Sequence, residues 1–263
     1  MPGTVKFVLP ENSHVTTVVK LIHRGLNIAS AIDAGSADGD FLLFLKACGA
    51  LPHAACLNVD ANSVYAESLR EIEAVTGTKF HIGPLAAHEG DVTMTRGGHI
   101  YWDSMRAPEE SYWKEGGIAP HDGSVARAVT LDELVREAGM KGPFLLKLDV
   151  QGGELSVLTG AVQTLKETAL LVVEINRPDL RPVDRFIEEA GFDLFDVTDI
   201  GRNSAGNFAW YYCTYLERSL MDRFGAPLWK PEETPKILAH QEKHRAGKLQ
   251  RNAQLLDLIR GRK

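Results

Sequence analysis

Short apolar runs alternate along the chain with stretches in which apolar residues recur every three or four positions. The short runs are typical of buried strands, and the wider spacing is typical of helices with one apolar face. We expect strands at Ile28–Asp33, Ala55–Asp60, Lys79–Ile82, Phe144–Leu148 and Thr168–Ile175. We expect helices at Val15–Gly25, Phe41–Ala50, Ser63–Val75, Thr130–Gly139 and Val183–Ala190. Strands that alternate with helices in this way predict a mostly parallel α/β sheet with helices on both faces.

Two further strands are expected near the end of this pattern, at Phe192–Val197 and Ala209–Leu216. The loop between them, Thr198–Phe208, is too short to hold a crossover helix, so the two strands should be antiparallel. The sequence therefore predicts an open, mostly parallel sheet that ends in an antiparallel strand pair.

The stretch I-D-A-G-S-A-D-G-D-F follows the first strand and leads into a helix. A strand, a glycine loop and a helix start in this order present a helix N-terminus to a ligand. The nearby carboxylates Asp33, Asp38 and Asp40 would repel a pyrophosphate. They suit S-adenosylmethionine, which carries a sulfonium, an ammonium group and hydroxyls. An ordinary strand-to-helix turn remains an alternative interpretation of this loop.

Further acidic side chains lie at the carboxyl ends of other expected strands, where open α/β sheets bind their ligands. Asp60 ends the second strand and is a candidate to hold the ribose hydroxyls of a nucleoside; a helix N-cap is the alternative, and both roles are compatible. We expect the cofactor to contact Asp33, Gly35, Ser36, Asp38, Gly39, Asp60, Ala61, Pro84, Leu85 and Asp149.

The second chemically distinctive stretch, L-L-K-L-D-V-Q-G-G-E-L, joins a buried strand to a helix. Lys147 and Asp149 share one face of the strand, and Glu174 on the next strand is the expected partner of Lys147. Asp149, Glu154 and Glu174 are the candidate catalytic residues. The structural alternative for Lys147 and Glu174 is an ion pair that holds two strands together. The structural alternative for Glu154 is that its charge stabilises the helix dipole. A general base could come from loop histidines, namely His88, His99 and His121, which the sequence does not rank.

Composition narrows the class of protein without identifying it. A formal net charge of -6 over 263 residues argues against general nucleic-acid binding and favours a small-molecule or saccharide acceptor. No apolar run reaches the roughly 20 residues that a membrane span needs. The N-terminus lacks a signal-peptide pattern, and the three cysteines form no C-x-x-C pair, so a cytoplasmic protein is expected.

The chain is expected to contain one catalytic domain over residues 1–230 and a basic helical extension over residues 231–263. Residues 96–124 are rich in Gly, Pro and aromatic side chains without a helical or strand period, which predicts a lid or substrate-specificity insert. The extension combines basic residues with an apolar stripe, so it could dock on its own acidic domain or support a homodimer.

The segments T-L-D-E-L, L-L-K-L-D-V-Q-G-G-E-L-S-V-L-T-G-A and L-V-V-E-I, together with the glycine loop, resemble the FkbM family of S-adenosylmethionine-dependent methyltransferases. The resemblance covers roughly residues 28–197 and implies a class I methyltransferase fold, similar to Rossmann folds, and O-methylation of a sugar or natural product. Gln151 stands where the family commonly has glutamate, and Asp60-Ala61 replaces the usual glutamate-proline pair.

Three further hypotheses concern a metal ion and the alternative functions. Asp149, Glu174 and Asn176 resemble the magnesium site of catechol-type O-methyltransferases, in which Mg²⁺ would hold the acceptor hydroxyl. A dinucleotide-dependent oxidoreductase is the alternative function, although it would need G-x-G-x-x-G, and the loop has glycines only at Gly35 and Gly39. The remaining alternative is a catalytically silent methyltransferase-like binding subunit.

Overall fold

The computed structural model describes residues 9–96, 103–104, 121–203, 205–225, 243 and 245. The chain divides into two compact units, Met1–Phe224 and Gly225–Lys263. The expected C-terminal helix therefore lies outside the described residues except at Lys243 and Arg245. All of the fold described below belongs to the first unit.

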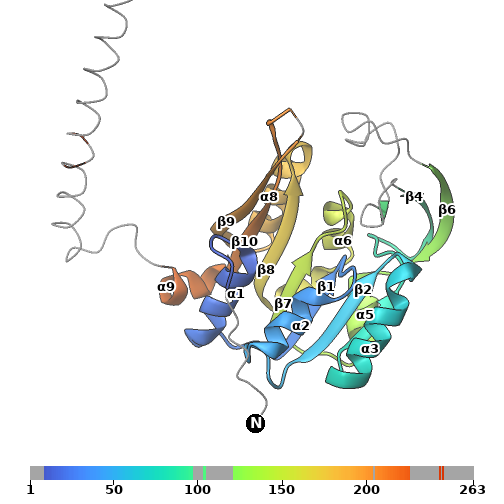
Figure 1. Cartoon of the computed structure of the whole chain (residues 1–263), viewed down its shortest axis with the longest axis horizontal. Coiled ribbons are helices and arrows are strands. Elements are labelled where there is room, and N and C mark those ends of the chain that lie inside the picture. The colour runs from blue at the N-terminus through green and yellow to red at the C-terminus, as the bar shows by residue number, and fades with distance from the viewer. Residues whose placement is uncertain are drawn as a thin grey trace, which may run out of the picture. The chain divides into compact units, whose positions relative to one another are not determined.

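A seven-stranded sheet with the order β3-β2-β1-β7-β8-β10-β9 forms the centre of the first unit (Figure 1). Its strands are β1 Ser30–Ala34, β2 Ala55–Asp60, β3 Lys79–Ile82, β7 Phe144–Leu148, β8 Thr168–Asn176, β9 Phe192–Arg202 and β10 Phe208–Glu217. The pairs from β3 to β8 are parallel, whereas β10 is antiparallel to both β8 and β9. This arrangement confirms the predicted class I methyltransferase architecture.

The final hairpin is longer than the sequence suggested. Residues 198–202 continue β9, so only residues 203–207 connect it to β10, and the expected loop Thr198–Phe208 is wrong in length. Gly201 looked like a loop residue, but it lies beneath the indole of Trp210, where an added Cβ would come within 2.1 Å of the ring. The glycine is therefore explained by close packing across the hairpin.

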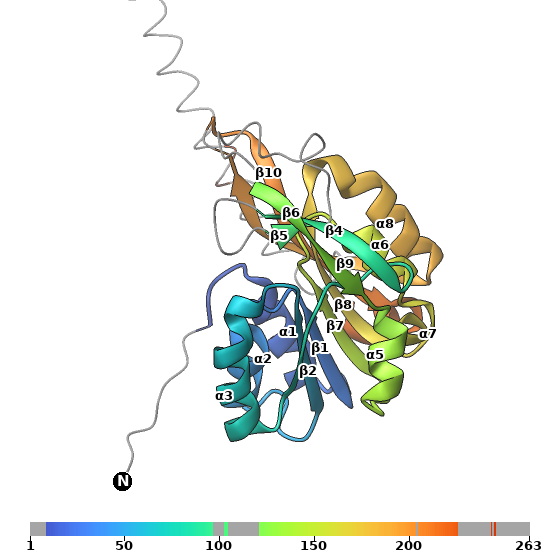
Figure 2. The ribbon, with the colours of Figure 1, turned by 90° about the vertical axis from the view of Figure 1, so that its right-hand side faces the viewer.

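Helices cover both faces of the main sheet (Figure 2). They are α1 His14–His23, α2 Asp40–Ala47, α3 Ala66–Thr76, α5 Leu131–Glu137, α6 Glu154–Thr159, α7 Val162–Lys166, α8 Leu180–Glu189 and α9 Met221–Phe224. Short 3₁₀ turns lie at Ser63–Tyr65, Arg177–Asp179 and Arg218–Leu220. Among the described residues, no helix combines the length and apolar character needed to cross a membrane.

Alternation along the strands separates two apolar cores. Ala31 and Leu145 face α1, α2 and α9, whereas Ile32 and Leu146 face α5 to α8. The same alternation places every second strand residue at the carboxyl edge on the α1 and α2 side. Asp33 and Lys147 therefore lie on that side.

Hydroxyl side chains cap two of the helix starts. The Ser13 hydroxyl accepts the Val15 N–H at the start of α1. The Thr130 hydroxyl accepts the Glu133 N–H at the start of α5, and the Glu133 carboxylate pairs with Arg136.

A second sheet is inserted between β3 and α5. It contains β4 Gly90–Arg96, β5 Asp103–Ser104 and β6 His121–Ala128 in the order β5-β4-β6, with antiparallel pairing. The backbone of Val129 exchanges hydrogen bonds with Pro84 O and Ala86 N, which ties this sheet to the loop after β3. Of the predicted insert 96–124, residues 97–102 and 105–120 lie outside the described residues.

Candidate active site

The glycine loop after β1 is held by backbone contacts with β2. The N–H groups of Gly35 and Ser36 both donate to Val59 O, at 2.8 and 3.1 Å, and the Ala37 N–H donates to Asp60 Oδ2 at 2.8 Å. Loop amides that are already bonded to β2 do not form the array of N–H groups that cradles a pyrophosphate. The loop geometry therefore does not favour a dinucleotide.

Gly35 is required by the approach of the next strand. Its φ is +80°, and an added Cβ would lie 1.8 Å from the carbonyl oxygen of Asp149. The Asp149 N–H in turn donates to Ala34 O at 2.8 Å. The backbones of the glycine loop and of the segment after β7 are thus packed directly against each other.

Asp60 joins two loops at the carboxyl end of β2. Its Oδ2 accepts the Ala37 N–H, and its Oδ1 accepts the Asn62 N–H, both at 2.8 Å. Asn62 supplies the side-chain cap of the 3₁₀ turn Ser63–Tyr65, so the N-cap interpretation of Asp60 is wrong. A carboxylate has about four lone-pair sites, which leaves Asp60 able to accept further hydrogen bonds from a ligand.

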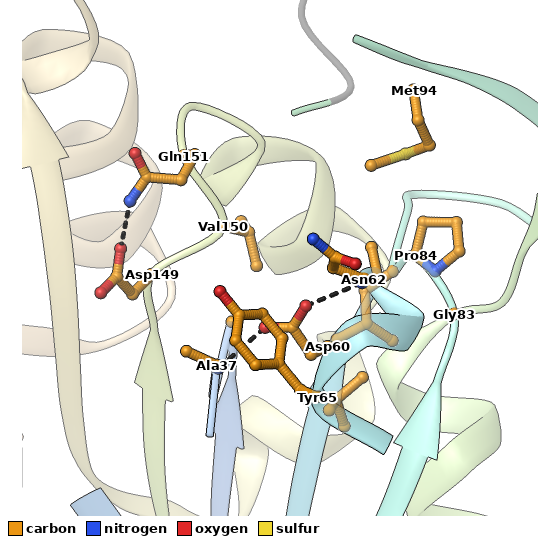
Figure 3. Close-up of a pocket in the computed structure, with 14 residues that line it drawn as sticks. Ala37, Asp60, Asn62, Tyr65, Gly83, Pro84, Met94, Asp149, Val150 and Gln151 are labelled. Carbon is orange, nitrogen blue, oxygen red and sulfur yellow. Dashed lines mark hydrogen bonds between the residues drawn. The ribbon is translucent and has the colours of Figure 1, made fainter. Parts of the chain in front are cut away.

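A pocket lies above the ends of β1, β2 and β7 (Figure 3). Figure 3 shows Asp149 and Gln151 on one side, Pro84 and Met94 on the other, and Asp60 at the base. Of the expected cofactor residues, the pocket is lined by Gly35, Asp60, Ala61, Pro84, Leu85 and Asp149. Sequence reasoning missed the further lining residues Ala37, Val59, Asn62, Tyr65, Gly83, Met94, Val150 and Gln151.

The remaining expected cofactor residues lie outside the pocket lining. Asp33 is fully buried, Ser36 and Gly39 are buried, and Asp38 is exposed. Gly39 has a φ of +81°, and an added Cβ would approach Leu69 and Asn58 within 3 Å. Gly39 therefore allows the loop to pack on β2 and α3.

Lys147 is paired across β1 and β7 rather than with the partner expected from the sequence. Its Nζ lies 2.9 Å from Asp33 Oδ1 and 3.6 Å from Asp149 Oδ2. The register explains this, because Asp33 is directly opposite Lys147, whereas the residue of β8 opposite Lys147 is Val172. Glu174 is thus a weaker electrostatic neighbour, and the predicted Lys147–Glu174 pair is corrected.

Burial and the ion pair have opposite effects on the pKa values of Lys147 and Asp33. Burial would lower the pKa of Lys147, but Asp33 and Asp149 raise it overall, so the lysine stays charged. Burial raises the pKa of Asp33 to about 6 despite the neighbouring ammonium group. The pair is a buried charge contact that supports the carboxyl edge of the sheet.

Asp149 accepts hydrogen bonds from two different elements. Gln151 Nε2 donates to its Oδ1 at 2.8 Å, and the Tyr212 hydroxyl on β10 donates to its Oδ2 at 2.5 Å. Burial, followed by the Asp149 charge, raises the pKa of Tyr212 well above its ordinary value, so the phenol remains a donor. Asp149 is therefore fixed in position while it lines the pocket.

The donor set around Asp149 does not fit the predicted magnesium site. Both of its oxygens accept hydrogen bonds, and the Lys147 ammonium lies where a cation would compete for Oδ2. Within the described part of the chain, no group of three or more His, Cys, Asp and Glu side chains is arranged to hold a metal ion. Mg²⁺ at Asp149, Glu174 and Asn176 is not supported.

Glu174 and Asn176 are buried on β8 next to this centre, with 7% and 5% of their surfaces exposed. Burial, and then the charge of Asp149, raise the pKa of Glu174. The Asn176 Nδ2 has no hydrogen-bond partner among the described residues. Both side chains lie at the end of β8 without the exposure that the sequence hypothesis assumed.

Glu154 holds the loop that precedes α6. Its carboxylate is 1% exposed, and Oε1 accepts the N–H groups of Val150 and Gly152 at 3.1 and 3.0 Å. Burial raises the pKa of Glu154 to about 7, opposed by backbone hydrogen bonds, first of all that of Gly152. This placement favours a positioning role beneath Gln151, and the predicted catalytic role of Glu154 stays a prediction.

The three candidate base histidines do not gather at the pocket in the described structure. His88 is exposed in a loop, and His99 lies outside the described residues. His121 begins strand β6 instead of lying in a loop, and its side chain is outside the described set. Tyr212, by contrast, was missed, because its position depends on the register between β8 and β10.

Several solved structures are similar to this chain. A crystal structure of the methyltransferase FkbM from Methylobacillus flagellatus matches with a TM-score of 0.45 and 13% identity, over 72% of this chain and 43% of that protein. This chain thus spans less than half the length of that relative. No curated protein matches the sequence.

Two further solved structures have similar scores. A putative tRNA (m1A22) methyltransferase from Streptococcus pneumoniae, in complex with S-adenosyl-L-methionine, has a TM-score of 0.45 and 13% identity over 90% of this chain and 88% of that one. A precorrin-6y C5,15-methyltransferase from Geobacter metallireducens has a TM-score of 0.43 and 13% identity over 82% and 92%.

The family assignment rests on the sequence rather than on these structures. The model of the methyltransferase FkbM domain matches residues 33–194, which begin at the end of β1 and end within β9. The matched region includes Asp60, Asp149 and Glu174 and covers more than half of the chain. The chain therefore belongs to the FkbM family of methyltransferase domains.

Proposed function

We propose that this chain binds S-adenosylmethionine in the pocket above β1, β2 and β7 and transfers its methyl group to an acceptor hydroxyl. The observation that carries the proposal is that Asp60 and Asp149 line one pocket together with the glycine loop. Two carboxylates in one pocket suit a ligand that has ribose hydroxyls and a positively charged amino-acid end. They suit a pyrophosphate poorly.

In this proposal, different residues of the pocket contact different parts of the cofactor. Asp60 would accept the ribose hydroxyls, while Tyr65, Pro84, Leu85 and Met94 offer apolar surface to an adenine ring. Asp149 would face the charged end, held in place by Gln151 and Tyr212. Gly35 lines the pocket between these two ends, and its missing side chain lets the backbone of Asp149 pack against the loop.

The bound cofactor would supply an electrophilic methyl group, so the protein has to orient the acceptor and accept its proton. The acceptor that we propose is a hydroxyl of a sugar or natural product, as the family resemblance implies. The acidic formal charge of -6 supports a small molecule or saccharide over a nucleic acid. The second sheet and residues 96–124 are the proposed acceptor-binding part of the chain.

Calorimetric titration of the full chain with S-adenosylhomocysteine, S-adenosylmethionine and NAD⁺ tests the cofactor. We expect the first two to bind and NAD⁺ not to bind, with Asp60→Ala weakening S-adenosylhomocysteine by about 1–3 kcal/mol. Because Asp60 also holds two loop amides, a 2′,3′-dideoxy analogue of S-adenosylhomocysteine is the control. The wild type should lose affinity for the analogue, whereas Asp60→Ala should bind both ligands alike.

Two results would contradict the assignment. Binding of NAD⁺ without binding of either S-adenosyl compound would indicate the oxidoreductase alternative. Equal loss for the deoxy analogue in wild type and Asp60→Ala would remove Asp60 from the ribose site. A panel of saccharides, phenols and RNA, incubated with tritiated S-adenosylmethionine, then identifies the acceptor, and labelling confined to RNA would contradict the proposed acceptor class.

A further inference from the structure

A histidine–aspartate pair lies beside the pocket but outside the stretch that matches the family. His14 is the first residue of α1, and its Nδ1 is 2.7 Å from Asp199 Oδ2 on β9. The backbone N–H of His14 donates to the same oxygen at 2.8 Å. A carboxylate oxygen accepts at both positions, so Nδ1 carries the ring proton and Nε2 keeps its lone pair. Nε2 has no hydrogen-bond partner among the described residues.

The backbone around this pair is held in an uncommon conformation. Asn12 and Asp199 both have positive φ, at 53° and 50°, and the Asp199 N–H donates to Asn12 O. Non-glycine residues in this region carry strain that tends to occur at functional sites. Thr17 on the same helix also donates to Asp196 Oδ2 at 2.6 Å, which fixes α1 against β9.

The imidazole is connected to the pocket through one side chain. His14 stacks on the Tyr212 ring with centroids 4.0 Å apart and an interplanar angle of 21°. The Tyr212 hydroxyl donates to Asp149, which lines the pocket. Trp210 packs edge-on against the same tyrosine, and its backbone neighbour Asn176 has an unpaired buried Nδ2. The Tyr212 side chain thus contacts His14 through the face of its ring and Asp149 through its hydroxyl.

The environment keeps His14 neutral. Burial lowers its pKa below the ordinary value of 6.5; the hydrogen bond and charge of Asp199 and the charge of Asp149 oppose this effect, and Lys147 adds to it. Tyr212, the other titratable group in contact with the ring, is held as a neutral phenol. The N-terminal end of α1 also disfavours an imidazolium. Near pH 7 the ring can therefore accept a proton at Nε2.

We propose that His14, oriented by Asp199, is the general base of the methyl transfer and that the acceptor binds next to Asp149, with its hydroxyl within reach of His14 Nε2. This inference rests on the proposed function. The acceptor oxygen forms a bond to the methyl carbon as the carbon–sulfur bond breaks and its electron pair stays on sulfur. The hydroxyl proton moves to Nε2, Asp199 compensates the imidazolium charge, and the proton then passes to water.

The first test uses NMR of the protein with ¹⁵N-labelled histidines, bound to S-adenosylhomocysteine. Two-bond ¹H–¹⁵N spectra report the tautomer of each ring, and His14→Gln assigns the His14 signals. With the ligand bound, we expect a neutral His14 with its proton on Nδ1 near pH 7.5, and Asp199→Ala should shift that proton toward Nε2. The second test measures methyl transfer to the best acceptor of the panel. His14→Gln should lower kcat by about 10²- to 10⁴-fold, with unchanged affinity for S-adenosylhomocysteine.

His23→Gln is the matched control, because His23 ends the same helix and is exposed. It should retain the wild-type rate, and thermal unfolding of both variants separates misfolding from lost chemistry. The rising limb of the wild-type pH–kcat profile should lie below pH 6.5 and disappear in His14→Gln. A charged or Nε2-protonated His14 in the liganded protein, or equal rates for the two glutamine variants, would overturn the dyad. Absence of S-adenosylhomocysteine binding to the wild type would instead overturn the proposed function.

Discussion

Side chains at the carboxyl edge of the sheet are held by partners on other strands, such as Asp33 for Lys147 and Tyr212 for Asp149. Strand lengths located Asp60, Asp149 and Glu174 at strand ends, because side chains at the end of a parallel strand face the ligand side. Partners depend on the register between strands, which no local pattern contains. Lys147 therefore pairs with Asp33 directly opposite it. His14 was missed for a related reason, since it reaches the edge through contacts with β9, far away in the sequence.

The buried carboxylate of Glu154 gives a prediction at this scale. Its pKa is raised from 4.5 to about 7 in the folded protein. The folded state thus binds more protons than the unfolded state in this range, and stability falls as pH rises from about 4.5 to about 7. Glu154→Gln keeps an acceptor for the Val150 and Gly152 N–H groups and removes the titration. We expect it to be more stable than wild type near pH 8, by up to about 3 kcal/mol, and similar near pH 4.

Urea unfolding at both pH values measures this difference. Glu67→Gln is the matched control, because Glu67 is an exposed acid in the first turn of α3. Its effect on stability should be small compared with that of Glu154→Gln near pH 8. A Glu154→Gln difference that does not change between the two pH values would contradict the raised pKa.

At the scale of elements, periodicity predicted the helices and central strands well because each has a fully buried apolar face. Two elements deviated. The end of β9, T-D-I-G-R, contains the polar and glycine residues of a loop but pairs with β10, because Gly201 accommodates Trp210. Asp91–Thr95 has the alternating pattern of a strand, but it belongs to β4 of the second sheet, where it pairs with β6. The composition of the pocket also depends on such contacts, since Met94 comes from β4.

The contact between the glycine loop and the segment after β7 should make Gly35 sensitive to substitution. Gly35→Ala would place a Cβ 1.8 Å from Asp149 O, so the two segments must separate. Gly49→Ala has a similar φ of +77° but no atom within 4 Å of the added Cβ. We expect Gly49→Ala to cost about 1–2 kcal/mol of stability from conformation alone. Gly35→Ala should cost clearly more and abolish S-adenosylhomocysteine binding, as measured by unfolding and calorimetry. Equal costs would show that the loop adapts without moving Asp149.

For the whole molecule, the sequence predicted a change of character near the C-terminus. The chain has a compact first unit that ends at Phe224, and the family match lies within that unit. The basic tail predicted from residue 231 is not placed by the described residues, so its role as a docking or dimerisation helix stays a prediction. No local pattern states what such a helix packs against.

Removal of the residues after Glu233 tests the tail. We expect S-adenosylhomocysteine affinity to stay within about twofold, because every residue of the pocket belongs to the first unit. Oligomeric state or solubility should change, as light scattering of the shortened and full chains would detect. Full-length protein with Leu249→Ser and Leu256→Ser is the control that keeps the charges. The same number of chains per particle in both proteins would rule out a dimer formed through the tail, and lost affinity would make the tail part of the catalytic fold.

The pairing of Arg96 with His121 has a consequence for how such a protein can diverge. Neighbouring antiparallel strands lie about 5 Å apart, so the two ends of the intervening stretch are held close together. The stretch between these two residues can then lengthen, shorten or be exchanged at a small entropic cost, without shifting the register of the main sheet. If the proposed function holds, recombination at these two positions would exchange the acceptor-binding part and leave the proposed cofactor pocket unchanged.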